Sequence, residues 1–234
     1  MKKKVNIYVD GFNFYYGLKD MVKHKRDWRK FYWIDLVKLF EQFLLEDEEL
    51  GTVHYFTARP KNKGKTARQN NLMNCNKVIN GDKLKIHYGK YQDKSMKCRA
   101  DDGCGKEFMH WEEKQTDVSL AIKMIEDCHN NDCNKIILVS GDSDFLPPLK
   151  LIKNFYKTID LTVLFPPVKY TNSIVTLGLT CVSMDRYKTK WNKAVLDSVF
   201  EIDGKTFRMP VEWTLKLLPH SSAQKSLLVQ VFLA

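Results

Sequence analysis

The stretch Val5-Asn-Ile-Tyr-Val-Asp-Gly-Phe-Asn-Phe14 decides the fold of this 234-residue chain. Its β-branched residues alternate with polar or aromatic ones as far as Asp10, and Gly11 then interrupts the run. This pattern predicts a short strand that ends in a carboxylate. Ligands bind at the carboxyl ends of the strands in an open α/β sheet. Asp10, with the Asn13 amide nearby, is therefore either a metal or catalytic group or only the cap of the following helix, and this stretch alone favours neither.

The stretch Lys135-Ile-Ile-Leu-Val-Ser-Gly-Asp-Ser-Asp-Phe145 has the same design. Its apolar run, residues 136–139, is typical of a parallel strand that is buried on both faces. Ser140 and Gly141 follow, and then two acids, Asp142 and Asp144. Two such carboxylates repel each other unless a proton or a cation lies between them, and a hard divalent ion suits oxygen ligands best. Helix capping would explain one of these acids, but not both of them together with an acid at an equivalent strand end.

The pattern of the remaining chain alternates between strands and helices, which predicts the α/β class. We expect further strands at residues 52–58, 83–88, 160–165 and 180–184. Helices are expected at residues 12–22, 36–44, 66–80, 112–128 and 170–177, and another directly after Asp144, with two prolines in its first turn. Thr66 is the expected cap of the third of these helices.

Asp117 is expected in the first turns of the helix at residues 112–128, which is apolar on most sides and is predicted to lie deep against the sheet. Glu113 would lie one turn earlier on the same face. A buried helix does not direct a charge inward without a partner. Asp117 therefore either accepts local backbone hydrogen bonds or faces a cation. Thr116 would suffice as a local cap, so Asp117 alone does not distinguish between these two alternatives.

Positive charge is the main feature of the overall composition, with a formal net charge of +10. It favours a polyanionic partner, nucleic acid first, although a basic surface can also serve solubility alone. Residues 59–68 contain five cations and no acid, and in a parallel sheet this loop would leave the same edge as the first strand. Such charge suits a phosphate backbone, whereas the alternative is a solvated loop. The expected RNA contacts are Arg59, Lys61, Lys63, Lys65 and Arg68, together with Lys97 and Arg99 from a long polar insertion.

The cysteines and the N-terminus indicate a reducing compartment. The six cysteines form no regular disulfide pattern, and the basic start is not followed by an export signal. No stretch approaches the ~18 apolar residues of a membrane span, so we expect a cytoplasmic protein without a membrane partner. Cys98 and Cys104 suggest half of a zinc knuckle, at a wider spacing than CxxC. Cys75, His87 or His110 could complete it but do not obviously converge, so a structural Zn²⁺ stays open.

Three blocks resemble the signatures of the NYN domain, which belongs to the PIN-like nuclease superfamily. They are Asp10-Gly-Phe-Asn13, Glu113-Lys-Gln-Thr-Asp117 and Ser140-Gly-Asp-Ser-Asp-Phe145, and the closing Arg208-Met-Pro-Val-Glu-Trp213 is similar to the end of many bacterial members. The resemblance implies a three-layer α/β/α fold with a mainly parallel central sheet, PIN-like or Rossmann-like. The domain would cover residues 1–213, with a Cys-bearing insertion at about 89–111. Residues 214–234 would form a peripheral tail.

The resemblance also implies a function, namely cleavage of RNA in an acidic pocket that binds Mg²⁺ or Mn²⁺. Carried over by position, the catalytic and metal-binding acids would be Asp10, Asp117, Asp142 and Asp144, with Asn13 and Ser140 as polar neighbours. All four acids are present, so we expect a metal-dependent ribonuclease that acts on single-stranded RNA.

Other readings of the site compete with this one. One alternative is a catalytically weak or inactive nucleic-acid-binding or regulatory module of the same fold. A phosphohydrolase of the haloacid dehalogenase type would need an acid where this chain has Phe12. The Cys-bearing insertion departs from the family pattern and leaves the shape of the substrate open. The oligomeric state is also open, a homodimer included.

Overall fold

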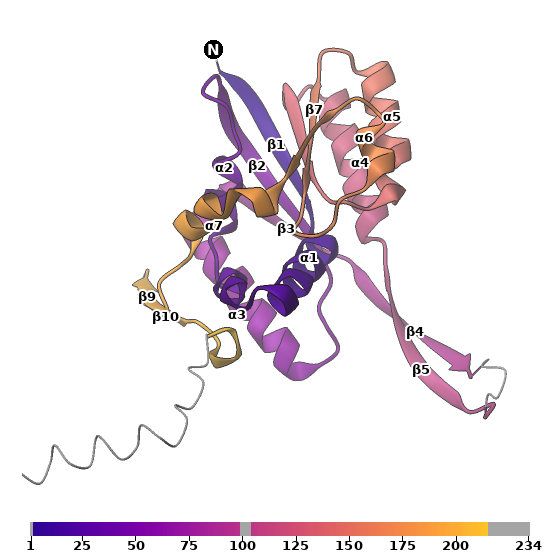
Figure 1. Ribbon diagram of the computed structural model, residues 1–234, viewed down its shortest axis with the longest axis vertical. Coiled ribbons are helices and arrows are strands. Elements are labelled where there is room, and N and C mark those ends of the chain that lie inside the picture. The colour runs from indigo at the N-terminus through magenta and orange to yellow at the C-terminus, as the bar shows by residue number, and fades with distance from the viewer. Residues whose placement is uncertain (1, 99–103, 215–234) are drawn as a thin grey trace, which may run out of the picture.

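A parallel sheet forms the centre of the computed structural model. The structure describes residues 2–98 and 104–214, apart from the side chains of residues 110–113. Within these residues the central sheet has six strands in the order β3-β2-β1-β6-β7-β8, and all neighbours run parallel (Figure 1). The mainly parallel sheet is thereby confirmed. The strands are β1 (Lys3–Asp10), β2 (Glu48–Thr57), β3 (Leu84–Tyr88), β6 (Lys135–Val139), β7 (Asp160–Phe165) and β8 (Thr180–Ser183).

Strand β1 shows that the two faces of the sheet pack against two different layers of helices. Val5, Ile7 and Val9 are fully buried on one face, whereas Tyr8 between them packs into a separate cluster on the other face. Successive side chains of a strand point to opposite faces, so a sheet covered on both sides has apolar residues at nearly every position. The first face packs against α1 (Gly11–His24), α2 (Leu36–Glu41), α3 (Lys63–Asn80) and α7 (Lys188–Ala194), and the second against α4 (Thr116–His129), α5 (Leu146–Phe155) and α6 (Asn172–Val175). The predicted three-layer α/β/α fold is confirmed.

A buried polar network joins α4 to the sheet. Asp127 of α4 is 2% exposed and accepts hydrogen bonds from Asn6 Nδ2 at 3.1 Å and from the Tyr8 hydroxyl. Lys123 Nζ lies 2.9 Å from the other carboxylate oxygen. Burial opposes ionisation of Asp127, but the bonds from Tyr8 and Lys123 outweigh it and hold its pKa below the usual range. The network therefore fixes the position of α4, and with it the N-terminal turn of this helix, relative to β1.

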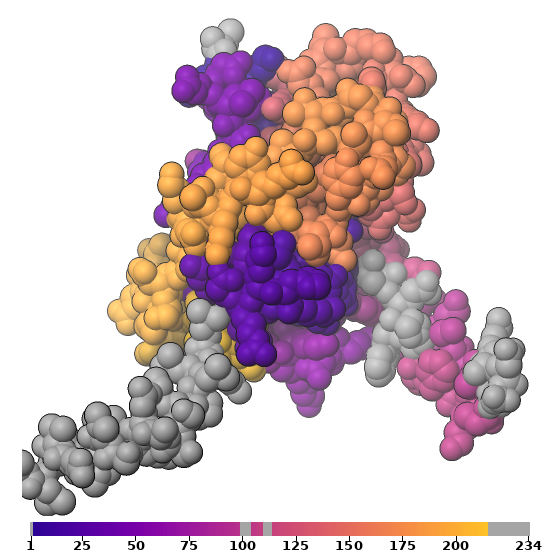
Figure 2. Space-filling model, in the orientation of Figure 1, coloured from indigo at the N-terminus to yellow at the C-terminus, as the bar shows by residue number. Residues whose placement is uncertain are grey.

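The polar insertion has regular structure that the sequence did not predict. It forms an antiparallel hairpin of β4 (Lys90–Lys97) and β5 (Glu107–Lys114), which projects from the body as an arm (Figures 1 and 2). The predicted helix start at residue 112 is wrong, because α4 begins at Thr116 after Gln115, whose φ is 79°. Glu113 belongs to β5 and does not share a helix face with Asp117.

Helix α4 is also less buried than predicted. Val118 and Ile122 are 64% and 60% exposed, whereas Leu120 and Met124 are fully buried against the sheet. The apolar residues of α4 therefore extend beyond its buried face, and only part of its circumference contacts the core. The expectation that the helix is enclosed on most sides is wrong.

Helix α3 begins earlier than predicted. Its N-cap is Asn62, whose Oδ1 accepts a hydrogen bond from the backbone N of Lys65 at 3.0 Å. Asn caps helices as well as Thr does, so the earlier residue can start the helix. The Thr66 hydroxyl instead donates to the carbonyl of Pro60. Residues 63–65, which were expected to precede the helix, therefore belong to the first turn of α3.

The last described elements pack beside this core. Strands β9 (Val199–Ile202) and β10 (Lys205–Arg208) form an antiparallel hairpin whose Phe200 and Phe207 join a small cluster around Trp33 and Cys75. Nearly all of the predicted tail, from residue 215 onward, lies outside the described residues. Among the helices that the structure describes, each is too short or too polar to cross a membrane.

Candidate active site

Asp10 links the end of β1 to the start of α1. Its Oδ1 accepts hydrogen bonds from the backbone N of Phe12 at 3.1 Å and of Asn13 at 3.0 Å, so it is the N-cap of the helix. Its Oδ2 accepts a bond from Ser140 Oγ at 2.9 Å. The side chain is 5% exposed, and this burial raises its pKa to about 6, although the bonds from Asn13 and Ser140 oppose the rise. Asp10 is therefore a helix cap and also a buried carboxylate of the site.

Asp142 is held by the turn that follows β6. The fully buried Ser140 accepts a hydrogen bond from the Asp142 backbone N at 3.0 Å, and the Gly141 backbone N donates to Asn13 Oδ1 at 2.9 Å. A Cβ atom on Gly141 would lie 1.7 Å from the carbonyl oxygen of Lys169, so only glycine fits here. The hydrogen bond between Gly141 and Asn13 connects this turn to the first turn of α1.

Asp117 approaches from the N-terminal turn of α4. It is half-buried, and its pKa is raised first by burial and then by the negative charges of Asp142 and Asp144. Asp144 itself is exposed and donates its backbone N–H to Asp142 Oδ1 at 3.0 Å. It acts on Asp117 through its charge but does not line the pocket that the other three acids share.

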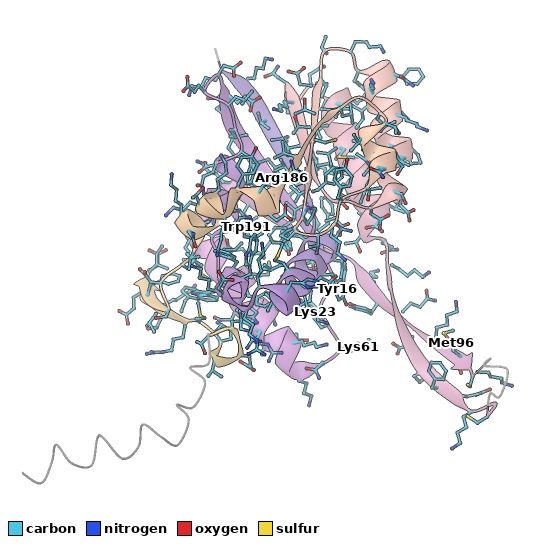
Figure 3. All side chains as sticks on the ribbon, in the orientation of Figure 1. Tyr16, Lys23, Lys61, Met96, Arg186 and Trp191 are labelled. Atoms are coloured by element: carbon cyan, nitrogen blue, oxygen red, sulfur yellow. The ribbon has the colours of Figure 1, made fainter. Side chains whose placement is uncertain are left out.

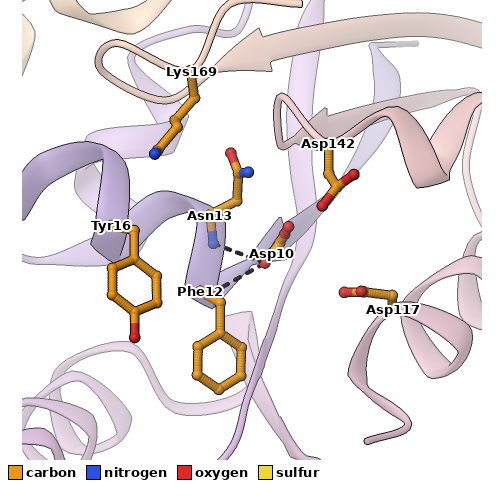
Figure 4. Close-up of a pocket in the computed structure, with 7 residues that line it drawn as sticks. All are labelled: Asp10, Phe12, Asn13, Tyr16, Asp117, Asp142 and Lys169. Atoms are coloured by element: carbon orange, nitrogen blue, oxygen red, sulfur yellow. Dashed lines mark hydrogen bonds between the residues drawn. The ribbon is translucent and has the colours of Figure 1, made fainter. Parts of the chain in front are cut away.

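The three acids Asp10, Asp117 and Asp142 line one pocket of about 270 Å³ (Figure 4). It lies at the carboxyl edge of the sheet, between β1, with β2 and β3 beyond it, and β6, with β7 and β8 beyond it. In open α/β sheets the order of strands reverses at such a point, and the crevice there binds ligands. Three of the four predicted acids, Asp10, Asp117 and Asp142, therefore meet at this pocket, whereas Asp144 lies outside its lining.

The other residues around this acidic pocket are Phe12, Asn13, Tyr16 and Lys169. Lys169 brings a positive charge to the rim, where its Nζ also lies 2.9 Å from Asp20 Oδ2. We did not identify Lys169 from the sequence. It lies in the loop that follows a predicted strand and two prolines, at the same edge as the acids, and this position is the signal that could have identified it.

The acidic pocket has the donor chemistry of a site for a hard cation. Asp117 and Asp142 each raise the pKa of Asp10, so negative charge accumulates where a cation would relieve it. Within the described part of the chain, no group of three or more His, Cys, Asp or Glu side chains is arranged to hold a metal ion. What the acidic pocket does offer is carboxylate oxygens beside one another, the ligand type that hard divalent cations take.

The predicted RNA contacts from residues 59–68 fall in two places. Arg59 and Lys61 follow β2 and line a second pocket at the base of the hairpin arm. Lys63 and Lys65 are exposed in the first turn of α3. Arg68 is half-buried, and its guanidinium lies 2.6 Å from Glu212 Oε1.

The predicted contacts and zinc ligands of the insertion lie on the hairpin arm. Lys97 Nζ lies 3.4 Å from Glu107 Oε1 across the two strands. Arg99 lies outside the described residues, between Cys98, which is half-buried, and Cys104, which is exposed. His87, a proposed further zinc ligand, makes a 3.0 Å contact with His54 instead. Whether this end of the arm holds a zinc ion stays open, as it was from the sequence.

The sequence pattern of the NYN domain matches residues 4–174, and the chain therefore belongs to the NYN domain family. The fold and the acidic pocket agree with this membership.

Two similar proteins show how far the likeness extends. The chain is 25% identical over 181 residues to 6-hydroxy-3-succinoylpyridine 3-monooxygenase HspA from Pseudomonas putida (strain DSM 28022 / S16), a match of 64% of this chain and 55% of that protein. The chain thus spans about half the length of this curated relative. The crystal structure of a protein of unknown function, VPA0982 from Vibrio parahaemolyticus RIMD 2210633, is similar with a TM-score of 0.53 and 19% identity, covering 83% of this chain and 97% of that chain. This second likeness shows the fold alone.

Proposed function

We propose that this protein is a divalent-metal-dependent ribonuclease that cleaves phosphodiester bonds of single-stranded RNA. The observation that carries the proposal is the meeting of Asp10, Asp117 and Asp142, from three separate segments, around one pocket with Lys169 at its rim. The negative charges of Asp117 and Asp142 raise the pKa of Asp10, which favours a bound cation, and a nearby lysine favours a phosphate.

Asp10 and Asp142 are the proposed direct ligands of Mg²⁺ or Mn²⁺. Ser140 positions them relative to each other, since its hydroxyl donates to Asp10 and accepts from the backbone of Asp142. Asn13 supports this arrangement through its bond to the Gly141 backbone. When bound, the ion would supply positive charge beside the scissile phosphate and lower the pKa of the attacking water.

The other lining residues have complementary tasks in this proposal. Asp117, half-buried and with a raised pKa, accepts a proton from the attacking water. Lys169 holds a phosphate oxygen, and Asp144 adds negative charge from outside the pocket. The rings of Phe12 and Tyr16 stand on the pocket wall, where a base can stack (Figure 4). A single strand offers unstacked bases for such contacts and a duplex does not, which favours single-stranded RNA.

The Pseudomonas relative is named as a monooxygenase, an activity that belongs to that protein. In the acidic pocket of this chain the charged side chains that could bind a metal ion are carboxylates. Carboxylate and water oxygens suit Mg²⁺ and Mn²⁺, whereas imidazole suits iron and copper. The donor set therefore supports hydrolysis of a phosphodiester. The main rival is an RNA-binding module of the same fold that does not cleave.

The test incubates labelled single-stranded RNA with the wild type and with Asp142→Asn, in Mn²⁺ and in chelator. Asparagine keeps the acceptor for the Asp144 backbone bond, so the turn should keep its shape. We expect cleavage by the wild type in Mn²⁺ only, and a loss of at least ~100-fold in the variant. Asp160→Asn, at the exposed start of β7, is the matched control and should cleave normally.

Two outcomes would decide against the proposal. RNA binding by the wild type without cleavage in Mn²⁺ or Mg²⁺ would establish the binding module. Equal cleavage by wild type and Asp142→Asn would show that the activity does not come from this pocket.

A further inference from the structure

A second cavity, of about 480 Å³, lies at the base of the hairpin arm. We call it the hairpin-base pocket, and its lining residues are Arg59, Lys61, Tyr88, Gly89, Lys90 and Tyr91. Its volume falls within the ~300–1,000 Å³ typical of pockets that hold small ligands. Its lining residues are different from those of the acidic pocket and have no part in the proposed cleavage step.

Hydrogen bonds and an ion pair hold the walls of this pocket together. Gln69 Nε2 donates to Thr57 Oγ1 at 3.0 Å, and the Gly89 backbone N donates to the Thr57 carbonyl at 2.8 Å. The second bond places the end of β2 beside the start of the arm, and the first joins α3 to the same strand end. Lys61 Nζ lies 2.6 Å from Asp93 Oδ1 and so connects the loop after β2 to β4. Lys61 lies near the body, whereas Met96 lies out on the arm (Figure 3).

The lining chemistry combines cations with aromatic rings. The Arg59 guanidinium lies 4.8 Å from the centre of the Tyr88 ring, and Tyr88 is 36% exposed. Among the described residues, Arg59 and Lys90 have no carboxylate partner, whereas Lys61 is paired. Backbone-binding cations beside aromatic faces are the usual composition of a single-strand binding site.

The hairpin-base pocket adjoins the acidic pocket. Phe12 lines the acidic pocket and Tyr91 lines the hairpin-base pocket. Their rings meet edge to face, with centroids 6.5 Å apart. A strand that passes over this aromatic pair would therefore occupy both pockets in succession.

We propose that the hairpin-base pocket binds one nucleotide of single-stranded RNA next to the phosphate in the acidic pocket. Its base packs against Tyr88 and Tyr91, and its phosphate contacts Arg59 and Lys90. The choice of RNA as ligand rests on the proposed function. The pocket would select substrates that extend beyond the scissile bond and would set the register in which the strand is held.

The experiment uses the Asp142→Asn variant as the parent protein and contains chelator, so that cleavage does not interfere. Fluorescence anisotropy measures how tightly this protein binds a fluorescent 12-nucleotide RNA. Adding Tyr88→Ala should weaken binding about tenfold or more, whereas Tyr88→Phe should not. The slope of log affinity against log salt should stay unchanged in Tyr88→Ala and fall by about 0.7 in Arg59→Ala. Tyr187→Ala is the matched control, since this exposed tyrosine also lies beneath a cation, Lys190, outside both pockets.

A second set of RNAs tests for a defined nucleotide, each carrying one abasic position. The penalty of Tyr88→Ala should disappear for the RNA that lacks the base at one particular position. Equal binding of Tyr88→Ala and its parent, or a penalty that persists on every abasic RNA, would overturn the subsite. Binding that depends on Tyr88, together with no cleavage by the wild type in Mn²⁺, would retain the subsite and overturn the ribonuclease proposal alone.

Discussion

Replacing Asp10 with asparagine should make the protein more stable at pH 8 when no metal is present. Asp10 is almost completely buried, and at pH 8 it carries a negative charge next to Asp117 and Asp142. Asparagine has nearly the same shape, remains neutral and can still cap α1. The substitution therefore removes an electrostatic penalty and keeps most of the hydrogen bonds.

The size of this effect follows from the pKa. Burial raises the pKa of Asp10 from 3.8 to about 6, so the folded state binds the proton more tightly than the unfolded state does. The resulting stability is complete below about pH 4 and is lost as the pH rises through 6. The two pKa values differ by about 2, which at about 1.4 kcal/mol per pKa unit corresponds to about 3 kcal/mol. Asp10→Asn should regain most of this at pH 8.

Thermal unfolding in chelator measures the difference. For a domain of this size, about 3 kcal/mol corresponds to a Tm increase of about 6–10 °C at pH 8. The advantage should shrink by about 2 kcal/mol at pH 4.5, where Asp10 is mostly protonated in the folded state. Adding Mn²⁺ should stabilise the wild type and leave Asp10→Asn unchanged.

Asp160→Asn is the control, because it removes only an exposed ion pair with Lys3, and such pairs contribute little to stability. A variant no more stable than the wild type at pH 8 in chelator would refute the argument from burial. Equal stabilisation of wild type and Asp10→Asn by Mn²⁺ would exclude Asp10 as a ligand.

Three further substitutions test other parts of the structure. Gly141→Ala should lower the free energy of unfolding by about 3 kcal/mol or more, because its Cβ would collide with the Lys169 carbonyl; an unchanged urea midpoint would show that the turn can move. Asp127→Ala should cost about 3–5 kcal/mol by leaving buried partners such as Tyr8 unpaired, and a loss below about 1 kcal/mol in urea would contradict this. Lys169→Met should raise the KM for RNA about 5- to 10-fold with little loss of stability, since its half-buried partner Asp20 keeps its ion pair with Lys23; an unchanged KM would remove Lys169 from substrate binding.

The strands that carry the acids could be predicted because they are buried. Residues 5–9 and 136–139 show the β-branched and apolar runs that a covered parallel sheet requires. The carboxylates that follow each run could therefore be placed at one edge of the sheet. That β1 and β6 are direct neighbours could not be predicted, because strand order depends on packing between distant segments.

The hairpin arm could not be predicted for the opposite reason. Strand β4 is almost entirely exposed, so its sequence shows no alternation of apolar and polar residues. The pattern there indicates a loop, so the pocket at the base of the arm could not be predicted either. Lys169 escaped prediction because its role depends on where β7 lies in the sheet. Arg59 and Lys61, in contrast, were identified correctly as lying at the edge of the sheet, since they directly follow a recognisable strand.

The order in which the chain is made bears on when the acidic pocket exists. Asp10 and Ser140, joined by a hydrogen bond, are 130 residues apart, and Asn13 and Gly141 are 128 apart. A growing chain cannot pair β1 with β6 until the 130 residues that lead from Asp10 to Ser140 have been synthesised. Contacts across such separations form late, because a long loop must close first. A protein proposed to cut RNA, which is itself made on a ribosome, would thus leave the exit tunnel with its acids still dispersed and assemble them only once most of the domain has emerged.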